Sequence, residues 1–358
     1  MKSKANEIIS RRLRSPDYKG LQKIKKVHWT AHNIPLTETE STLGSSKNLV
    51  GEEPRTQIIK NNLYLFTGRS SLSALRLVDL GCLEGGLSFE MAREDIKVVG
   101  IEGSEANYHK CQLLHEYFDL PNLNFLYLDV KALNRESHGV FDIVLCCGLL
   151  YHLDDPVAFL KLLYTITHDE SILILDTHFA PQESGLKNCT FKDSLSDMRT
   201  LEHNGVSYEG RLYYEYNDDA DGDNHPWASV SNSTSFWLTK ESLIRALYHT
   251  GFKTIYELHG IFEIEAEINL KKEYSRLGCI ALRKDFAHLR QVIDSGDARG
   301  MCEKEIDELR KNLEAIEKSL FWKVAIRFYR LRDRLLPNDS PRRKLYNKAM
   351  DFLRRSDP

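Results

Sequence analysis

The sequence has no apolar run long enough to cross a bilayer as a helix, which takes about 20 residues, so we expect no transmembrane segment. Its first residues contain no apolar core of a signal peptide. It also has no Cys-x-x-Cys pair, and its seven cysteines are scattered, which argues against a disulfide framework and a structural zinc site. These absences predict reduced thiols and a cytoplasmic location.

Charge of the two signs is almost balanced over the 358 residues, with a net charge of −3, but it is unevenly distributed. Residues 322–358 hold eleven Lys and Arg against four Asp, a net +7, which leaves −10 for residues 1–321. A basic tail of this kind predicts an anionic partner: the inner face of a membrane, nucleic acid or an acidic protein. A solvated basic helix is the alternative interpretation.

Residues 285–358 are predicted to form a helical, coiled-coil-like and basic C-terminal extension. Within positions 300–321, apolar residues step by three and four, as in the a/d seam of a coiled coil: Ile306, Leu309, Leu313, Ile316 and Leu320. This seam covers only about two heptads, and it predicts self-association. The basic amphipathic segment after it is typical of peripheral contact with a membrane surface.

Residues 71–284 alternate short apolar runs with helical stretches, which is typical of a doubly wound, mostly parallel α/β sheet. The expected strands are 75–80, 96–101, 123–128, 140–147 and 171–176. The expected helices are 53–67, 86–94, 104–117 and 156–168. Such a sheet binds its ligand beyond the carboxyl ends of its strands.

Two additions to this sheet are predicted. Residues 1–70 are expected to form an N-terminal helical cover, which starts with one basic helix within 1–30. Residues 180–235 are polar, aromatic and irregular, and we interpret them as an inserted substrate cap. A helix with Thr239 as N-cap and Gly251 as its stop follows. The closing strands are expected at 253–258 and 278–283.

The most informative stretch runs from Asp79 to Gly85, Asp-Leu-Gly-Cys-Leu-Glu-Gly, between an apolar strand and a helix. Its glycines let the backbone approach a nucleotide-like cofactor, and Glu102 at the end of the next strand can accept hydrogen bonds from ribose hydroxyls. A dehydrogenase would have Gly-x-Gly-x-x-Gly instead. The stretch resembles the cofactor loop of the class I S-adenosylmethionine-dependent methyltransferases, with Leu83 in place of their third glycine.

This resemblance implies a Rossmann-like methyltransferase fold with S-adenosylmethionine as cofactor. The cofactor-binding residues that it implies are Asp79, Gly81, Gly85, Glu102, Asp129, Val130, Gly148 and Leu149. Asp79 would lie near the methionine moiety, Glu102 at the ribose and Asp129 beside the adenine amino group. Other interpretations stay open for these acids, which also occur as strand-end caps, surface acids and turn residues.

Gly148 begins Gly-Leu-Leu-Tyr-His-Leu-Asp-Asp-Pro, a segment that resembles the Leu-Tyr-His segment of methyltransferases acting on sugars and natural products, and of a tRNA wobble-uridine carboxymethyltransferase family. Tyr151 and His152 follow the end of a strand, where the transferred methyl is expected. Methyl transfer requires an aligned nucleophile and removal of its proton. We therefore predict Tyr151 and His152 as catalytic residues, with His152 as general base. A helix-capping or packing histidine is the alternative.

The segment 29–36, Trp-Thr-Ala-His-Asn-Ile-Pro-Leu, resembles an entry segment found ahead of the cofactor loop in glycan-associated methyltransferases. It predicts that His32 and Asn33 face the cofactor, unless the segment only packs. Trp227 and Trp237 resemble cap residues that either stack on a sugar or base or join the core. The acidic run 219–224 lacks the glycine at position six of a calcium loop, and Val230 stands where the bidentate glutamate belongs, so we expect no metal site.

From these features we predict a methyltransferase that acts on an oxygen of a sugar or other small-molecule acceptor, a hydroxyl or a carboxyl, in surface-glycan or natural-product biosynthesis. The C-terminal extension, which resembles tails on enzymes of bacterial surface-polysaccharide assembly, agrees with that setting. Two alternatives stay open. One is a tRNA-modifying transferase of the same fold, in which the basic tail contacts phosphates. The other is a catalytically silent cofactor-binding scaffold.

Overall fold

The computed structural model describes residues 4–187, 189–215, 229–230, 232–258 and 276–284. The chain divides into two compact units, residues 1–285 and 286–358. All described residues belong to the first unit, so the predicted coiled-coil seam and basic tail lie outside them.

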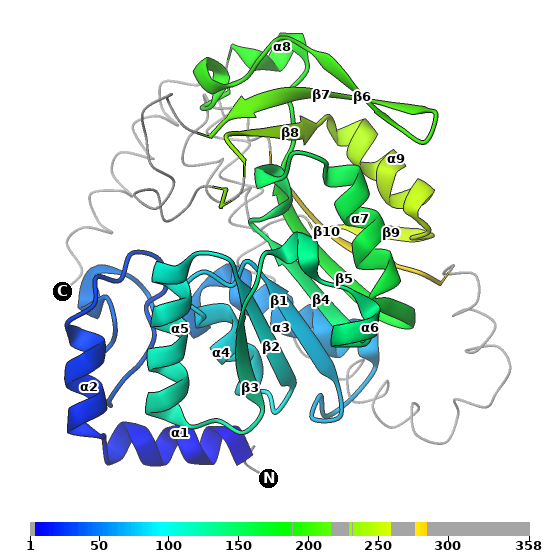
Figure 1. Cartoon of the computed structure of the whole chain (residues 1–358). Coiled ribbons are helices and arrows are strands. Elements are labelled where there is room, and N and C mark those ends of the chain that lie inside the picture. Colours follow the sequence, from blue (N-terminus) through cyan, green and yellow to red (C-terminus); the bar gives the residue numbers. More distant parts are fainter. Residues whose placement is uncertain (1–3, 188, 216–228, 231, 259–275, 285–358) are drawn as a thin grey trace, which may run out of the picture. The chain divides into compact units, whose positions relative to one another are not determined.

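The core of the first unit is a seven-stranded sheet (Figure 1) with the order β3-β2-β1-β4-β5-β10-β9. The strands are β1 (Arg76–Leu80), β2 (Lys97–Glu102), β3 (Leu123–Tyr127), β4 (Phe141–Cys147), β5 (Thr167–His178), β9 (Thr254–Glu257) and β10 (Arg276–Leu282). The first five run parallel and β10 pairs antiparallel with β5. The predicted doubly wound, mostly parallel α/β fold is confirmed.

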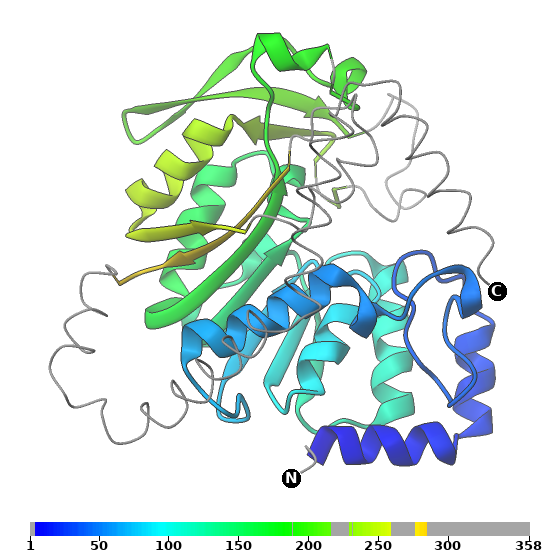
Figure 2. The ribbon, with the colours of Figure 1, turned by 180° about the vertical axis from the view of Figure 1, so that it is seen from behind.

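Helices cover both faces of the sheet because alternate apolar residues of each strand point to opposite sides. Leu77 packs in the cluster that includes the inner faces of α3 (Pro54–Thr67), α4 (Gly86–Ala92) and α5 (Glu105–Phe118). Its neighbour Val78 packs in the cluster with α7 (Pro156–Thr165) and α9 (Lys240–Thr250). Accordingly, α7 lies before the sheet in Figure 1 and α3 before it in Figure 2.

The N-terminal cover contains two helices, α1 (Lys4–Arg14) and α2 (Tyr18–Lys25), so the prediction of a single basic helix was wrong. Pro16 separates them, since a proline disfavours helical geometry in the residue before it and has no N–H to continue the helix. Asp17 then starts α2 by accepting a hydrogen bond from the Lys19 N–H at 3.1 Å.

The predicted irregular cap instead contains a three-stranded antiparallel sheet, β6 (Arg199–His203), β7 (Val206–Tyr214) and β8 (Thr234–Leu238). Asn204 and Gly205 join the first two strands, with φ values of 51° and 75°, as the two central residues of a tight hairpin require. Thr239 caps α9 as predicted, and the three residues before it belong to β8. A short helix, α8 (Glu183–Leu186), precedes this sheet.

Candidate active site

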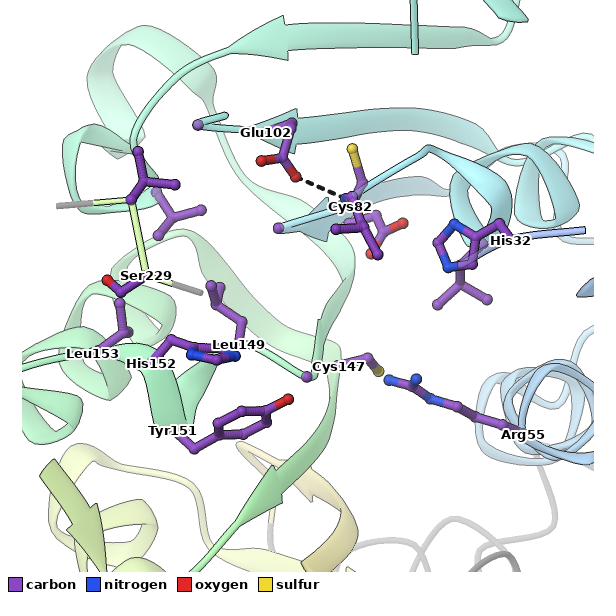
Figure 3. Close-up of a pocket in the computed structure, with 18 of the residues that line it drawn as sticks. His32, Arg55, Cys82, Glu102, Cys147, Leu149, Tyr151, His152, Leu153 and Ser229 are labelled. Carbon is purple, nitrogen blue, oxygen red and sulfur yellow. Dashed lines mark hydrogen bonds between the residues drawn. The ribbon is translucent and has the colours of Figure 1, made fainter. Parts of the chain in front are cut away.

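A cavity of about 340 Å³ lies beyond the carboxyl ends of β1, β2 and β4, where an open parallel sheet binds its ligand. Nearly all the predicted site residues line it: Asp79, Gly81, Glu102, Asp129, Val130, Gly148, Leu149, Tyr151 and His152. Figure 3 shows Tyr151 and His152 across the cavity from Glu102. The structure thus brings together residues that are up to 73 positions apart in the sequence.

The loop between β1 and α4 turns sharply, with left-handed backbone at Gly81, Leu83 and Gly85. At Gly81 a Cβ would lie 3.1 Å from the Leu149 side chain, so glycine is needed for this close approach. Gly85 does not line the cavity. A Cβ there would lie 2.9 Å from the Phe125 ring, so Gly85 serves the packing of the loop on β3, and its contact with a cofactor stays a prediction.

Leu83 has the left-handed conformation (φ 55°) that glycine favours, and two hydrogen bonds hold it there. Its N–H donates to Glu102 Oε2 at 2.8 Å, the dashed line in Figure 3. Its carbonyl accepts from the Cys111 thiol at 3.2 Å. Leu83 thus adopts a left-handed backbone at the position of the usual glycine.

Two buried carboxyl groups stand at the ends of neighbouring strands. Asp79 accepts a hydrogen bond from Ser88 Oγ at 2.6 Å, and burial raises its pKa to about 6. Glu102 accepts from the Ser104 N–H at 2.8 Å as well as from Leu83, and burial raises its pKa. Asp129 lines the cavity and also accepts from the Lys131 N–H at 2.9 Å, so it is a turn residue as well as a candidate ligand.

Glu84, a residue that the sequence analysis missed, fastens the N-terminal segment to this loop. Its side chain is fully buried and accepts hydrogen bonds from the N–H groups of Thr30, Ala31 and His32 at 2.7–2.9 Å. Lys110 Nζ lies 2.8 Å away. These donors outweigh the cost of burial and lower the pKa of Glu84 to about 2. No sequence pattern signals the contact, because the partners are more than 50 positions apart.

His32 lines the cavity as predicted, and its Nδ1 accepts a hydrogen bond from the Gly86 N–H at 3.1 Å. Burial lowers its pKa to about 4, so the ring is neutral near pH 7 and carries its proton on Nε2. Asn33 does not face the cavity, which corrects the prediction. It is buried and bonds the backbone of Leu43, Gly44 and Lys47, so it shapes the next loop.

His152 is paired with Glu215, which the sequence analysis also missed. The histidine ends a 3₁₀ turn, Leu150–His152, that begins three residues after the end of β4, and Glu215 follows β7. The two Glu215 oxygens lie 3.0 and 2.9 Å from His152 Nδ1, and the Glu215 side chain is only 2% exposed. A carboxylate beside an imidazole in a cavity is an arrangement suited to proton removal.

Two arginines enclose the end of the cavity next to Tyr151. Arg55 of α3 and Arg276 of β10 both pair with the buried Asp176, at 2.8 and 2.7 Å. These cations hold the pKa of Asp176 below its usual range although burial opposes them. Burial raises the pKa of Tyr151, so its hydroxyl stays protonated near pH 7.

Trp237 belongs to the core of the cap. It is 1% exposed, its ring stacks between His178 and Tyr213 at centroid distances of 5.0 and 4.6 Å, and its indole N–H donates to the Tyr151 carbonyl at 2.8 Å. It therefore supports Tyr151 from behind and is not free to stack on a ligand. The other predicted cap tryptophan, Trp227, lies outside the described residues.

Within the part of the chain that the structure describes, no three His, Cys, Asp or Glu side chains form a group that could hold a metal ion. The acidic run 219–224 lies outside that part. The described helices also include none that is both long and apolar enough to cross a membrane.

Comparisons with known proteins agree with this geometry. Residues 71–220 match a family model described as a methyltransferase domain. The ubiquinone biosynthesis O-methyltransferase of Acinetobacter baylyi is 32% identical over 95 residues, 26% of this chain and 40% of the relative. The tRNA U34 carboxymethyltransferase of Campylobacter concisus is 32% identical over 110 residues, 30% of this chain and 37% of the relative. The chain thus spans about two fifths of these curated relatives.

Among solved structures, the N-terminal domain of EvdMO1 with SAH bound has the same fold. It is 21% identical, with a TM-score of 0.54 over 75% of this chain and 98% of that domain. The neighbour binds SAH, and the acids at the strand ends of this cavity, Asp79 and Glu102, suit the cofactor S-adenosylmethionine. By sequence, residues 71–220 match a methyltransferase domain, and the first unit has the fold of the class I S-adenosylmethionine-dependent methyltransferases.

Proposed function

We propose that this chain transfers a methyl group from S-adenosylmethionine to a hydroxyl oxygen of a small polar acceptor such as a sugar. The observation that carries the proposal is the position of the His152–Glu215 pair in the same cavity as Asp79 and Glu102. One wall thus has acids suited to the cofactor, and another has a histidine suited to take a proton.

The residues of the cavity fit S-adenosylmethionine in size and charge. A volume of about 340 Å³ lies within the range of small-molecule sites, about 300–1,000 Å³. The carboxyl groups of Asp79 and Glu102 are buried beside it, where negative charge favours the positive sulfonium and amino groups of the ligand. We propose the eight cofactor-binding residues of the sequence prediction on this basis, with Gly85 acting through the loop backbone.

When bound, S-adenosylmethionine supplies a methyl group on a positively charged sulfur, which becomes a neutral thioether on transfer. His152 removes the acceptor's hydroxyl proton at Nε2, the ring nitrogen that is not bonded to Glu215. Tyr151 keeps its own proton and can donate a hydrogen bond to the acceptor. Leu149 and Leu153 line the cavity with apolar surface and exclude water from the reacting atoms.

The need for a base supports a hydroxyl acceptor over a carboxyl, since a carboxylate is already ionised near pH 7 and has no proton to lose. Oxygen as the acceptor atom is supported by the ubiquinone biosynthesis O-methyltransferases among the relatives, which match part of this chain. The tRNA carboxymethyltransferase relative supports the alternative acceptor, an RNA base or its modification.

The test begins with the cofactor. We expect the chain to bind S-adenosylhomocysteine in calorimetry, and Glu102→Ala to weaken the affinity more than tenfold, because hydrogen bonds to a charged group contribute about 1.5–3 kcal/mol each. Glu105→Ala is the matched control, since Glu105 is exposed at the start of α5. Its affinity should stay within about twofold of the unmodified chain. An unchanged affinity in Glu102→Ala contradicts the assignment of this cavity.

The second step incubates the chain with methyl-labelled S-adenosylmethionine and separate free sugars, nucleotide-linked sugars, phenols and bulk tRNA. We expect label in a hydroxyl-bearing small molecule and its loss in His152→Ala with S-adenosylhomocysteine binding retained. Label in tRNA alone replaces the small-molecule proposal with the RNA alternative. Binding without transfer to any fraction of a cell lysate supports the silent scaffold.

A further inference from the structure

We infer that Glu215 is a positioning residue that selects the reactive tautomer of His152, an inference that rests on the proposed role of His152 as base. Both Glu215 oxygens lie within hydrogen-bond distance of His152 Nδ1, at 3.0 and 2.9 Å. The side chains are 2% and 16% exposed, so little water competes for the contact. The pair joins the turn after β4 to the residue after β7, 63 positions away.

The chemistry of the two groups decides which ring nitrogen holds the proton. An ionised carboxylate only accepts hydrogen bonds, so Nδ1 has to carry the hydrogen of a neutral imidazole. Nε2 then has a free lone pair, and His152 lines the cavity in which the acceptor is proposed to bind. After proton transfer the ring becomes an imidazolium, and the carboxylate next to it stabilises that charge.

Glu215 is itself held by other residues of the cap. Ser235 Oγ donates to its Oε1 at 2.8 Å, and the Ser229 N–H donates to its Oε2 at 3.4 Å. These donors fix the carboxylate on the side of Nδ1 and satisfy the lone pairs that the histidine leaves.

Two residues of the cap, Ser229 and Asn232, also hold the backbone of His152. Asn232 donates from Nδ2 to the His152 carbonyl at 3.0 Å, and Ser229 Oγ donates to Asn232 Oδ1 at 2.7 Å. Ring and backbone of one histidine are therefore fixed by connected residues of the cap. Holding both the ring and the backbone places a base precisely. This matters because a small misplacement of a reacting group lowers the rate strongly.

The experiment compares full-length Glu215→Ala with Glu209→Ala, a matched control that removes an exposed glutamate of β7. Long-range ¹H–¹⁵N spectra of ring-labelled histidine are recorded without acceptor, with His152→Ala identifying the signal. We expect His152 to be protonated at Nδ1 in the unmodified chain and in Glu209→Ala. In Glu215→Ala we expect a mixture of both tautomers.

Rates are measured with the acceptor that takes up label in the transfer assay. We expect Glu215→Ala to lower kcat about 100-fold to 1,000-fold, in line with the loss of a general base, while the Kd for S-adenosylhomocysteine stays within about twofold. Ser235→Ala is a second, milder variant that keeps the carboxylate and removes one of its donors. Ser235→Ala should lower kcat about tenfold, and it tests the role of Glu215 if Glu215→Ala does not fold.

A proton on Nε2 in the unmodified chain overturns the inference, as does an unchanged tautomer in both Glu215→Ala and Ser235→Ala. A loss of rate that follows an equal loss of cofactor affinity also overturns it, because Glu215 would then act only on the structure. If the unmodified chain binds the cofactor product but methylates nothing, the proposed function fails. The tautomer comparison still decides the role of Glu215 in that case.

Discussion

Leu83 occupies a backbone position that favours glycine, and its neighbours explain how. A left-handed conformation costs a non-glycine residue roughly 1–2 kcal/mol. The hydrogen bonds from its N–H to Glu102 and from Cys111 to its carbonyl each contribute about 1 kcal/mol, which offsets that cost. The bond to Glu102 also orients one oxygen of the acid proposed to hold the ribose. Leu83 replaces the usual glycine here and keeps a left-handed backbone.

Asp79 gives the site a pH dependence. Because burial raises its pKa to about 6, the carboxyl is largely protonated below that pH and ionised above it. A ligand with a positive amino group binds the ionised form more tightly, so the affinity for S-adenosylhomocysteine should rise from pH 5 to pH 7 and then level off. The change should not exceed about tenfold per pH unit.

Calorimetric titrations at pH 5, 6, 7 and 8 measure this dependence, and Asp79→Asn is the comparison. The variant should bind more weakly at pH 7 and show a flatter profile, because it has no proton to lose at this position. A profile in Asp79→Asn as steep as that of the unmodified chain would assign the dependence to another group.

At the scale of elements, the N-terminal cover is attached to the cofactor loop mainly through Glu84. One carboxylate accepts hydrogen bonds from three successive N–H groups of the segment 30–32 and from the ammonium of Lys110. This contact places His32 at the start of α4, where its Nδ1 accepts from Gly86. The loop that bends around the cavity is therefore also the anchor of the segment that covers it.

Glu84→Ala should destabilise the chain by about 3–5 kcal/mol, since it leaves a buried ammonium without its carboxylate partner. Urea unfolding measures the loss, and hydrogen exchange of residues 30–32 should become faster. Lys23→Ala is the control, because the Lys23–Glu116 pair is exposed and contributes less than about 1 kcal/mol. Equal losses in the two variants would contradict the role of Glu84.

The same contact predicts an acid-sensitive stability. The pKa of Glu84 is lowered from 4.5 to about 2 in the folded chain, so its contribution is complete above pH 4.5. It is lost as the pH falls from 4.5 towards 2. Unfolding curves between pH 6 and pH 3 should show a decline in the unmodified chain, and a smaller decline in Glu84→Ala.

Sequence patterns predicted the elements of the central sheet well and those of the cap poorly. Strands such as β1 and β4 are buried on both faces, so they appear as continuous apolar runs that stand out from the helices. Strands β6 and β7 are half exposed and carry mixed residues, and only Asn204-Gly205 signalled their hairpin.

The candidate site was predictable to the extent that its residues follow strand ends. Asp79 and Glu102 lie at the end of a predicted strand or directly after it, and His152 follows another within five positions. Parallel strands end at one edge of the sheet. Glu84 holds the segment 30–32 and Glu215 holds His152, each across more than 50 positions, and such contacts depend on tertiary packing that no local spacing encodes. The sequence therefore predicted the lining of the cavity and missed the groups that hold it.

At the scale of the whole molecule, the cavity draws its lining from the N-terminal cover, the sheet, the cap and β10. His32 and Arg276 both line the cavity, although in sequence they lie near the beginning and near the end of the first unit. Among the residues that the structure describes, every one that lines the cavity precedes residue 286, where the second unit begins. Cofactor binding should therefore depend on the first unit alone, and the basic tail should have a separate role.

A chain ended after Asp285 tests this division. Because it keeps every lining residue that the structure describes, its Kd for S-adenosylhomocysteine should stay within about twofold of the full chain. Residues 322–358 carry a net +7, so the full chain should sediment with vesicles that contain anionic lipid, and less so at high salt. The shortened chain, with a more negative net charge, should stay in the supernatant, and neutral vesicles should bind neither. Sedimentation of the shortened chain with anionic vesicles would exclude the tail as the membrane-binding element.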